Sequence, residues 1–489
     1  MAVQALTYRE APAGSVLHVR LTNAVGTFAS RPGEPVDAVL IAPVKVDGDT
    51  VIPSGTILHG RVKAVRRIGL GLVHETASLD VIFDSISLPG RAPIAVSTQL
   101  ASVDNGREEV TPSGEIREGR TTASWGNHAA HYIQAALLWN VHMQLAEWAV
   151  KSVVTQVSEP EIYLPSGTEL TLVLSDGLRL LSAPSTPDDA PGFTEDQRES
   201  LAPVISDLPE RAFAPAPKRK ETGRPADIVN LLFIGSREEI AAAFTAAGWS
   251  EARRANFRSH ISTAFAVAFD HGLRDAPMST LRINNVPPDM YWEKGFNDVS
   301  KRHHIRMWKI AGTWEGKELW VGAATRDVEI GFLRPGHMVT HRVEEHVDHE
   351  RDKVAYDLAF SACADAMDWW YRPAIPHSTR NATGDRMLTD GQLAVVQLNG
   401  CDNPRAFAAG NDSLPAHGSR WQRLLRREII TARSDLIRGN IYWRTYEGVR
   451  CLVTAVHNHR NSPEPDAAPQ PNLASRLQPG RLTSVVSFR

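Results

Sequence analysis

A dense group of ionisable residues lies in the stretch THRVEEHVDHERD, which runs from Thr340 to Asp352. Its thirteen residues include three histidines and five carboxylates. Imidazole and carboxylate groups bind divalent metals such as zinc and manganese, and they also serve as general acids and bases. The stretch precedes a predicted amphipathic helix, so the same residues could instead form the acidic first turn of that helix.

The first interpretation makes His341, Asp348 and Glu350 the ligands of a divalent metal, zinc or manganese. A water bound to this metal would supply hydroxide near neutral pH. Arg306 or Arg351 could then hold a phosphate group through its forked guanidinium. This arrangement would give a hydrolase of the phosphoesterase type.

A second segment offers partners for this site. In RHHIRMWKI the strand period of two places His304 and Arg306 on one face, so both could meet the metal ligands. Without a metal, His304 or His341 would act as a general base that the carboxylates orient. Asp327 is a further candidate, at the end of the next predicted strand.

The structural interpretation uses the same residues. Asp348 would cap the helix, and Glu350 would favour the positive end of its dipole. Arg351 would form a buried salt bridge between the helix and a strand. The sequence alone leaves both interpretations open, and HEXXH, GXSXG and GXXXXGK[ST] motifs are all absent from it.

The elements that must position these residues follow from local patterns. The runs 302–310 and 318–325 predict a β-hairpin, and 352–371 predicts a helix with a buried face. The stretch DIVNLLFIGSREEIAAAF predicts a strand, a Gly-Ser turn and a helix capped by Ser236. Residues 387–398 predict a turn and a closing strand.

A turn-strand pattern recurs in the first third of the chain: APAGSVLHVRL, VIPSGTILHGRV and YLPSGTELTLVL. In each copy a proline and a glycine form a turn, and alternating apolar residues then predict a half-buried strand. We therefore expect an antiparallel β-barrel or sandwich over residues 10–182. Residues 125–154 interrupt it with a predicted helix that carries His128, His131 and His142.

Composition describes a soluble globular protein, with 42% hydrophobic and 22% charged residues. The net charge of −3 argues against a nucleic-acid partner. Three widely spaced cysteines predict neither a disulfide framework nor a zinc site, and Cys363 is predicted to be a core residue of the helix over 352–371.

The predicted fold class is multidomain α+β. The barrel domain (10–182) and a Pro-rich linker (183–226) precede a mixed α/β domain (227–398). A basic helical extension (399–458) and a disordered tail (459–489) follow. Arginines and apolar residues are interleaved in the helix predicted over 420–439. This helix could pack on its own domain with a solvated face, or it could bind an anionic membrane surface or a partner.

Four motifs within 226–398 resemble the LssY C-terminal domain of bacteria: NLLFIGSREEIAAAFTAAGW, RHHIRMWKI, LWVGAATRDVEIGF and THRVEEHVDHERDKVAYDL. The family pattern falls here on Thr340, His341, Asp348, Glu350 and Arg351. More loosely, the PSGT strand starts resemble the soluble barrel of TrbI/VirB10-type envelope proteins.

These resemblances imply a bacterial envelope-associated protein that acts in binding or assembly, with no established reaction. The alternative is a hydrolase acting on phosphorylated lipids or envelope polymers. Expected partners are an envelope component, an anionic membrane, or a second copy bound through the barrel. The start MAVQALTYREAPAG shows no signal peptide. A periplasmic or envelope location is therefore predicted from the resemblance alone, with the cytoplasm as the alternative.

Overall fold

The computed structural model describes residues 8–27, 30–67, 77–88, 91–104, 108–118, 162–181, 190–215, 223–252, 281–295, 302–332, 339–405 and 421. The chain divides into two compact units, residues 1–440 and 441–489, and every described residue belongs to the first. The predicted helical insertion near 125–154 and the tail from 459 lie outside the described residues. Of the predicted basic helix over 420–439, only Trp421 is described.

The N-terminal domain is built from strands. They are β1 (Tyr8–Ala11), β2 (Val16–Leu21), β3 (Val25–Gly26), β4 (Pro35–Leu40), β5 (Val44–Val46), β6 (Asp49–Ile52), β7 (Ile57–Arg66), β8 (Ser78–Ser87), β9 (Ile94–Ala95), β10 (Thr98–Val103), β11 (Glu108–Val110), β12 (Glu115–Glu118), β13 (Tyr163–Leu164), β14 (Glu169–Leu174) and β15 (Leu178–Leu181).

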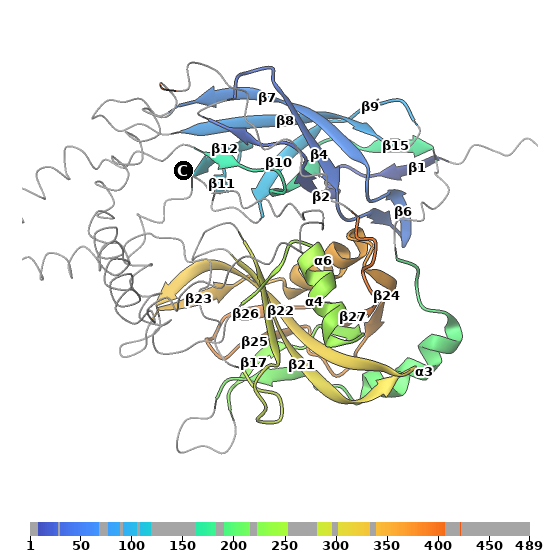
Figure 1. Ribbon diagram of the computed structural model, residues 1–489. Helices are drawn as coiled ribbons and strands as arrows, with labels where there is room; N and C mark the ends of the chain where they lie inside the picture. The colour runs from blue at the N-terminus through green and yellow to red at the C-terminus, as the bar shows by residue number, and fades with distance from the viewer. Residues whose placement is uncertain are drawn as a thin grey trace, which may run out of the picture. The chain divides into compact units, whose positions relative to one another are not determined.

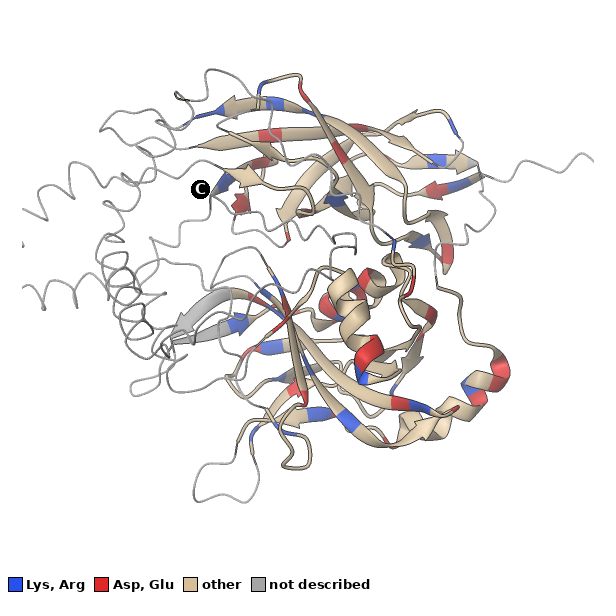
Figure 2. Ribbon diagram, viewed as in Figure 1, with Lys and Arg blue, Asp and Glu red and all other residues tan. Residues whose placement is uncertain are grey.

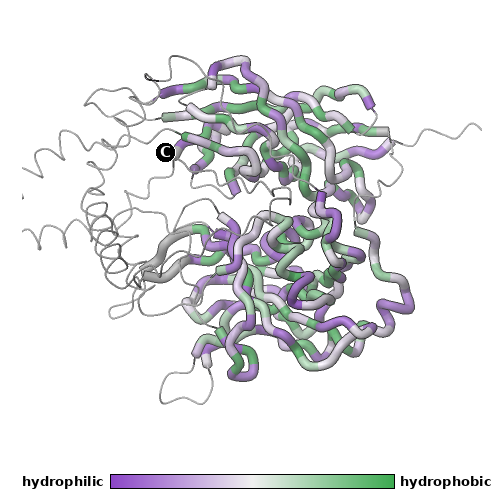
Figure 3. The backbone as a smooth tube through the Cα atoms, viewed as in Figure 1, coloured by the Kyte–Doolittle hydropathy of each residue, from purple (hydrophilic) through white to green (hydrophobic). Residues whose placement is uncertain are grey.

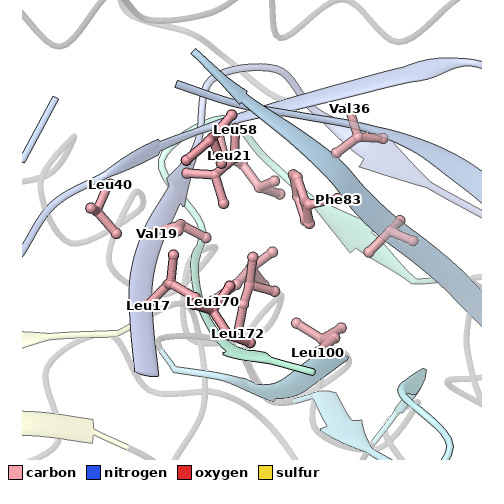
Figure 4. Packing of buried hydrophobic residues seen from close by; sticks show 14 of the residues in the cluster. Leu17, Val19, Leu21, Val36, Leu40, Leu58, Phe83, Leu100, Leu170 and Leu172 are labelled. Atoms are coloured by element: carbon pink, nitrogen blue, oxygen red, sulfur yellow. The ribbon is translucent and has the colours of Figure 1, made fainter. Parts of the chain in front are cut away.

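The main sheet of this domain has the order β10-β14-β2-β4-β7-β8-β12-β11, and its neighbours are antiparallel. β10, from one end of this order, also packs near β8 and β11 from the other end, so the sheet is nearly closed. Hydrophobic and hydrophilic residues alternate along its strands (Figure 3). The apolar set points inward, where Leu17, Phe83 and Leu172 share one core (Figure 4). The predicted β-barrel is confirmed.

The recurring turns behave as predicted. Gly14, Gly55 and Gly167 have φ angles of 88°, 79° and 91°, a region that glycine enters without steric cost. The next hydroxyl donates back to the proline carbonyl in every copy: Ser15 to Pro12, Thr56 to Pro53 and Thr168 to Pro165. Each turn therefore leads directly into a barrel strand, β2, β7 or β14.

The C-terminal domain mixes helices and strands. They are α3 (Glu195–Ser206), β16 (Arg211–Phe213), β17 (Pro225–Ile228), β18 (Leu231–Ile234), α4 (Arg237–Ala246), β19 (Ser250–Glu251), β20 (Met290–Lys294), β21 (Arg302–Trp314), β22 (Lys317–Phe332), β23 (Val339–Val343), α6 (Val347–Phe360), β24 (Ala364–Tyr371), β25 (Ser378–Arg380), β26 (Arg386–Leu388) and β27 (Gln392–Leu398).

One sheet organises this domain, in the order β19-β20-β21-β22-β18-β27-β24, with β23 paired to β22. β18 and β27 are parallel, whereas β22 is antiparallel to β18 and to β21. Helices α4 and α6 pack on one face, where Phe244 and Leu358 share a core with Phe233 (Figure 1). α3 covers the other face, through Leu201 and Ile205. The predicted mixed domain is confirmed.

The predicted hairpin and the β-turn-α unit are confirmed. β21 pairs with β22 from Arg302 to Trp314, with a bulge after Ile310, and a turn at Glu315 and Gly316 replaces the longer predicted connection. Ser236 begins α4 with a capping box, because its hydroxyl accepts from the Glu239 backbone and the Glu239 carboxylate accepts from Ser236 N.

The helix predicted over 352–371 is wrong in its second half. α6 ends at Phe360, and Ala362 then adopts a φ of 60°, which breaks the helix. The run ADAMDWWY forms β24 because its aromatic residues suit a strand and pair with β27. Cys363 therefore follows the helix, although it is fully buried as predicted.

Two further expectations differ from the structure. The segment 183–226 was predicted to be a linker, but it contains α3, which begins with a Thr194 capping box and buries two apolar residues on the sheet. Cys363 and Cys401 form a disulfide, with Cα atoms 4.7 Å apart. The two cysteines are 38 residues apart in the sequence, and this spacing does not predict a disulfide between them.

Charged residues of both signs are interspersed over the described strands and helices (Figure 2). No helix within these segments is long and apolar enough to cross a membrane.

Candidate binding cavity

Strand β21 points adjacent histidines to opposite faces of its sheet. His304 lies on the face of Trp308, where its Nε2 is 2.8 Å from the Thr325 hydroxyl and its Nδ1 is 3.6 Å from the Asp327 carboxylate. Arg306, on the same face, donates to Asp227 at 2.9 Å. These side chains are buried, and the contacts described for them do not include Asp348 or Glu350.

The residue that reaches α6 is His303. Its Nδ1 lies 2.6 Å from Glu350 Oε2, and its Nε2 lies 3.1 Å from the backbone oxygen of Asp104 in the barrel domain. The alternation along β21 was predicted correctly. The face of the sheet that packs against α6 was not predicted correctly, because a period of two does not indicate which face a distant helix will cover.

At the start of α6, Asp348 bonds to the turn before β27. It accepts from the Thr389 hydroxyl and from Asp390 N, both at 2.7 Å. Arg351 donates to both Asp390 oxygens, at 2.6 and 3.0 Å, and to Asp352 at 2.8 Å. Burial alone would lower the pKa of Arg351, but the hydrogen bonds that it donates to these carboxylates raise the pKa, so the guanidinium stays charged.

His341 lies on β23, where its backbone pairs with Ile330, and its side chain is outside the described residues. Across the part of the chain that the structure describes, no three His, Cys, Asp or Glu side chains are grouped for a metal. The predicted set of His341, Asp348 and Glu350 therefore stays a prediction. Of the three, Asp348 bonds to the β27 turn and Glu350 bonds to His303.

A cavity of about 530 Å³ opens beside His303 and Glu350. Its walls come from the barrel domain through β2, β10, β14 and the segment 41–45, and from the C-terminal domain through β21, β22 and α6. A volume of roughly 300–1,000 Å³ is usual for a small-molecule site, and such sites commonly lie between domains.

The histidines at the cavity differ in their electrostatics. The surrounding cavity walls partly desolvate His18 and lower its pKa, although its side chain is still exposed and Asp104 acts in the opposite direction. His349 is hydrogen-bonded to Glu344 at 2.8 Å, and this bond raises the pKa of His349. The cavity wall therefore holds one imidazole that favours the neutral form and one that favours the charged form.

A buried ion cluster adjoins the cavity and joins the two domains. We define it as Arg20 and Glu169 of the barrel with Lys294, Lys353 and Asp357 of the C-terminal domain. Arg20 contacts Asp357 at 3.0 Å and Glu169 at 2.7 Å, and Lys294 contacts the same carboxylates at 2.8 and 2.7 Å. Lys353 contacts Asp357 at 3.3 Å and also binds Glu169.

The ion cluster is charged in spite of its burial. Burial raises the pKa of Glu169 and of Asp357, but Lys294 and Lys353 outweigh it, so both pKa values are lowered. Burial and the charge of Arg20 lower the pKa of Lys294 to about 8. Most of this cluster cannot be predicted from the sequence, because only the spacing of Lys353 and Asp357, four residues apart on a helix, is a local signal.

Comparisons with known proteins found matches to a family model and to solved structures. No curated protein matches the chain. Among solved structures, ComB10 of the Com Type IV secretion system of Helicobacter pylori matches 35% of this chain and 89% of its own length, at 10% identity and a TM-score of 0.20. Residues 208–393 match the family model described as LssY C-terminus. This match confirms the resemblance to the LssY C-terminal domain that the sequence motifs predicted.

Proposed function

We propose that this chain is an envelope-associated binding protein of bacteria, in which the barrel and the LssY C-terminal domain share one ligand site. The proposal rests on the cavity, because residues of both domains form its walls. A ligand held there would contact both domains at once. The proposed activity is binding rather than a reaction.

The ion cluster supports a shared site. Its five side chains are between 1% and 14% exposed, and each domain contributes charges that the other neutralises. A shifted packing of the two domains would leave a buried charge without its counterion, which costs several kcal/mol per ion. The cluster therefore favours a single arrangement of the two domains around the cavity.

Envelope association is supported by the disulfide as well as by the family resemblance. Disulfides persist in oxidising compartments such as the bacterial periplasm and are rare in the cytosol. The pair Cys363 and Cys401 is consistent with such a compartment.

Binding is tested by native mass spectrometry of the full chain purified from its own host. Val16 lines the cavity and is 45% exposed, so Val16→Trp should fill the space without disturbing the core. Val328 is 37% exposed and lies away from the cavity lining, which makes Val328→Trp the matched control. We expect a small bound mass on the wild type and the control that is lost from Val16→Trp. Equal spectra for all three proteins would contradict the proposal.

The compartment is tested by thiol labelling in acid-quenched cells that carry a Cys451→Ser variant. This change leaves Cys363 and Cys401 as the only cysteines of the chain. We expect no labelling until a reductant is added. Immediate labelling of both thiols would place the chain in a reducing compartment and would contradict envelope association.

A further inference from the structure

We infer that the cavity takes a small ligand in which a protonated amine adjoins an apolar segment, and that Glu350 binds the ammonium group. The inference rests on the proposed function, since it assigns the ligand class of the same cavity.

Glu350 is the first reason. Its side chain is 2% exposed, and Oε2 lies 2.6 Å from His303 Nδ1. The other oxygen, Oε1, is buried and has no hydrogen-bond partner among the described residues, although Glu350 lines the cavity. A buried carboxylate oxygen without a partner is costly. A donor on a ligand in the cavity would satisfy it.

The negative charge of the cavity wall around Glu350 is the second reason. Asp104, Glu344 and Glu350 line it together with one guanidinium, Arg326, which lies 3.6 Å from Asp104 and 3.7 Å from Glu344. Even with His349, which is bonded to Glu344, counted as a second cation, the three carboxylates exceed the cations of this wall by one. An excess of negative charge favours a cationic ligand and disfavours an anionic one.

The other charges at the cavity have partners within the protein. The ion cluster neutralises Glu169 and Asp357, and Arg351 binds Asp352 at 2.8 Å. Lys45 lies over an aromatic ring, 5.3 Å from the centroid of Trp369. The negative excess is therefore confined to the wall around Glu350.

An apolar wall stands on the barrel side. Val16, Ile41, Ala42, Pro43 and Val44 line the cavity there. An alkyl or ring segment of the ligand would be removed from water against these side chains, which is favourable in proportion to its area. The two walls together select a ligand with one cationic end and one apolar end.

Three probes of equal length test this assignment by calorimetric titration of the full chain: n-hexylammonium, n-hexanol and n-hexanoate. We expect n-hexylammonium to bind about tenfold more tightly than n-hexanol, because a charge-assisted hydrogen bond is roughly twice as strong as a neutral one. We expect n-hexanoate to bind more weakly than n-hexanol, because its charge has the sign of the wall.

Variants locate the ammonium group. Glu350→Gln keeps the shape of the side chain and removes its charge, so n-hexylammonium should lose its advantage over n-hexanol. Glu345→Gln is the matched control, because Glu345 is 44% exposed, pairs with Arg386 and does not line the cavity. Val16→Trp should weaken all three probes. If Glu350→Gln does not fold, the ranking of the three probes on the wild type still decides the ligand class.

The outcomes separate the two proposals. If n-hexanol or n-hexanoate binds most tightly and Val16→Trp blocks it, the ligand class is overturned and the shared site stands. If no probe binds in a way that Val16→Trp reduces, both the ligand class and the shared site fail.

Discussion

Asp348 is a carboxylate in a motif that suggested chemistry, and its described contacts are structural. Its oxygens accept from Thr389 and Asp390, and Arg351 binds both Asp348 and Asp390. These bonds hold the first turn of α6 against the turn before β27. The geometry therefore matches the part of the structural interpretation in which salt bridges fix the helix start. The predicted cap is wrong, because α6 begins at Val347 with His346 at the N-cap position and no side-chain cap hydrogen bond. Asp348 lies inside the first turn and bonds to the turn before β27 instead.

We predict that Asp348→Ala lowers the free energy of unfolding by about 1–2 kcal/mol, since it removes hydrogen bonds from two donors and one partner of a buried guanidinium. Urea denaturation measures the change. Glu345→Ala, three residues earlier and 44% exposed, should change it by less than about 0.5 kcal/mol. Equal stability of Asp348→Ala and the wild type would show that these bonds contribute nothing.

Contacts between side chains could be predicted only where the two residues are close in the sequence. The cap by Ser236 was predicted from the adjacent residues, and the structure confirms it and adds Glu239 as the second half of a capping box. The contact between His303 and Glu350 joins residues 47 apart, and that between Arg20 and Asp357 joins residues 337 apart. Nothing in the neighbouring sequence specifies such pairs, because the tertiary packing of separate elements brings them together.

At the scale of elements, the Pro-Gly turns are what the sequence predicts best. Proline fixes φ at one position and glycine supplies a positive φ at another, so the turn is encoded within a few residues. The strands that follow, β2 and β14, are neighbours in the barrel sheet. Local backbone chemistry therefore sets where these strands begin, and the alternation of side chains sets which face is buried.

We predict that Gly167→Ala lowers the free energy of unfolding by about 1–2 kcal/mol, because a Cβ is strained at the φ of 91° found there. A Cβ at this position would meet nothing within 4 Å, so the cost is conformational and not a clash. Gly167→Asn should recover part of the loss, since asparagine tolerates positive φ better than alanine. Thermal and urea denaturation would give the ranking, and a neutral Gly167→Ala would contradict it.

The end of α6 shows why element type was less predictable than turns. Residues Cys363–Tyr371 follow an amphipathic helix, and no proline or glycine separates them from it. The sequence therefore predicts that the helix continues through these residues. In the structure, β24 pairs with β27 along its length, apart from a bulge after Ala364. Pairing with a strand that begins 21 residues after β24 ends outweighs the local helical pattern.

At the scale of the molecule, the ion cluster is the feature that makes the two domains one binding unit. It joins β2 and β14 of the barrel to β20 and α6 of the C-terminal domain. Trp249 adds a hydrogen bond from its indole to Asp357 at 3.0 Å. Three cations face two carboxylates, and loss of either carboxylate would leave buried positive charges that repel one another.

The cluster predicts a loss of stability in acid. Glu169 and Asp357 have lower pKa values in the folded protein than their ordinary 4.5 and 3.8. The unfolded chain therefore binds protons first as the pH falls. Their stabilising contribution is complete above about pH 4.5 and is lost as the pH falls through the lower folded values.

The measurement is the free energy of unfolding of the wild type and of Asp357→Asn between about pH 7 and pH 3. At neutral pH the variant should be less stable by about 3 kcal/mol, because one partner of a buried ion network is gone. The difference should shrink toward acid. A difference that is constant across this range would mean that Asp357 does not titrate as the cluster requires.

A double-mutant cycle on Arg20→Gln and Asp357→Asn tests whether the two domains pack together around the cavity, because these residues pair across the domains at 3.0 Å. We predict a coupling energy of about 2 kcal/mol in urea denaturation, which is the size expected for residues in one buried ionic network. A coupling energy near zero would mean that Arg20 and Asp357 do not meet in solution, and the shared cavity would then have no structural basis.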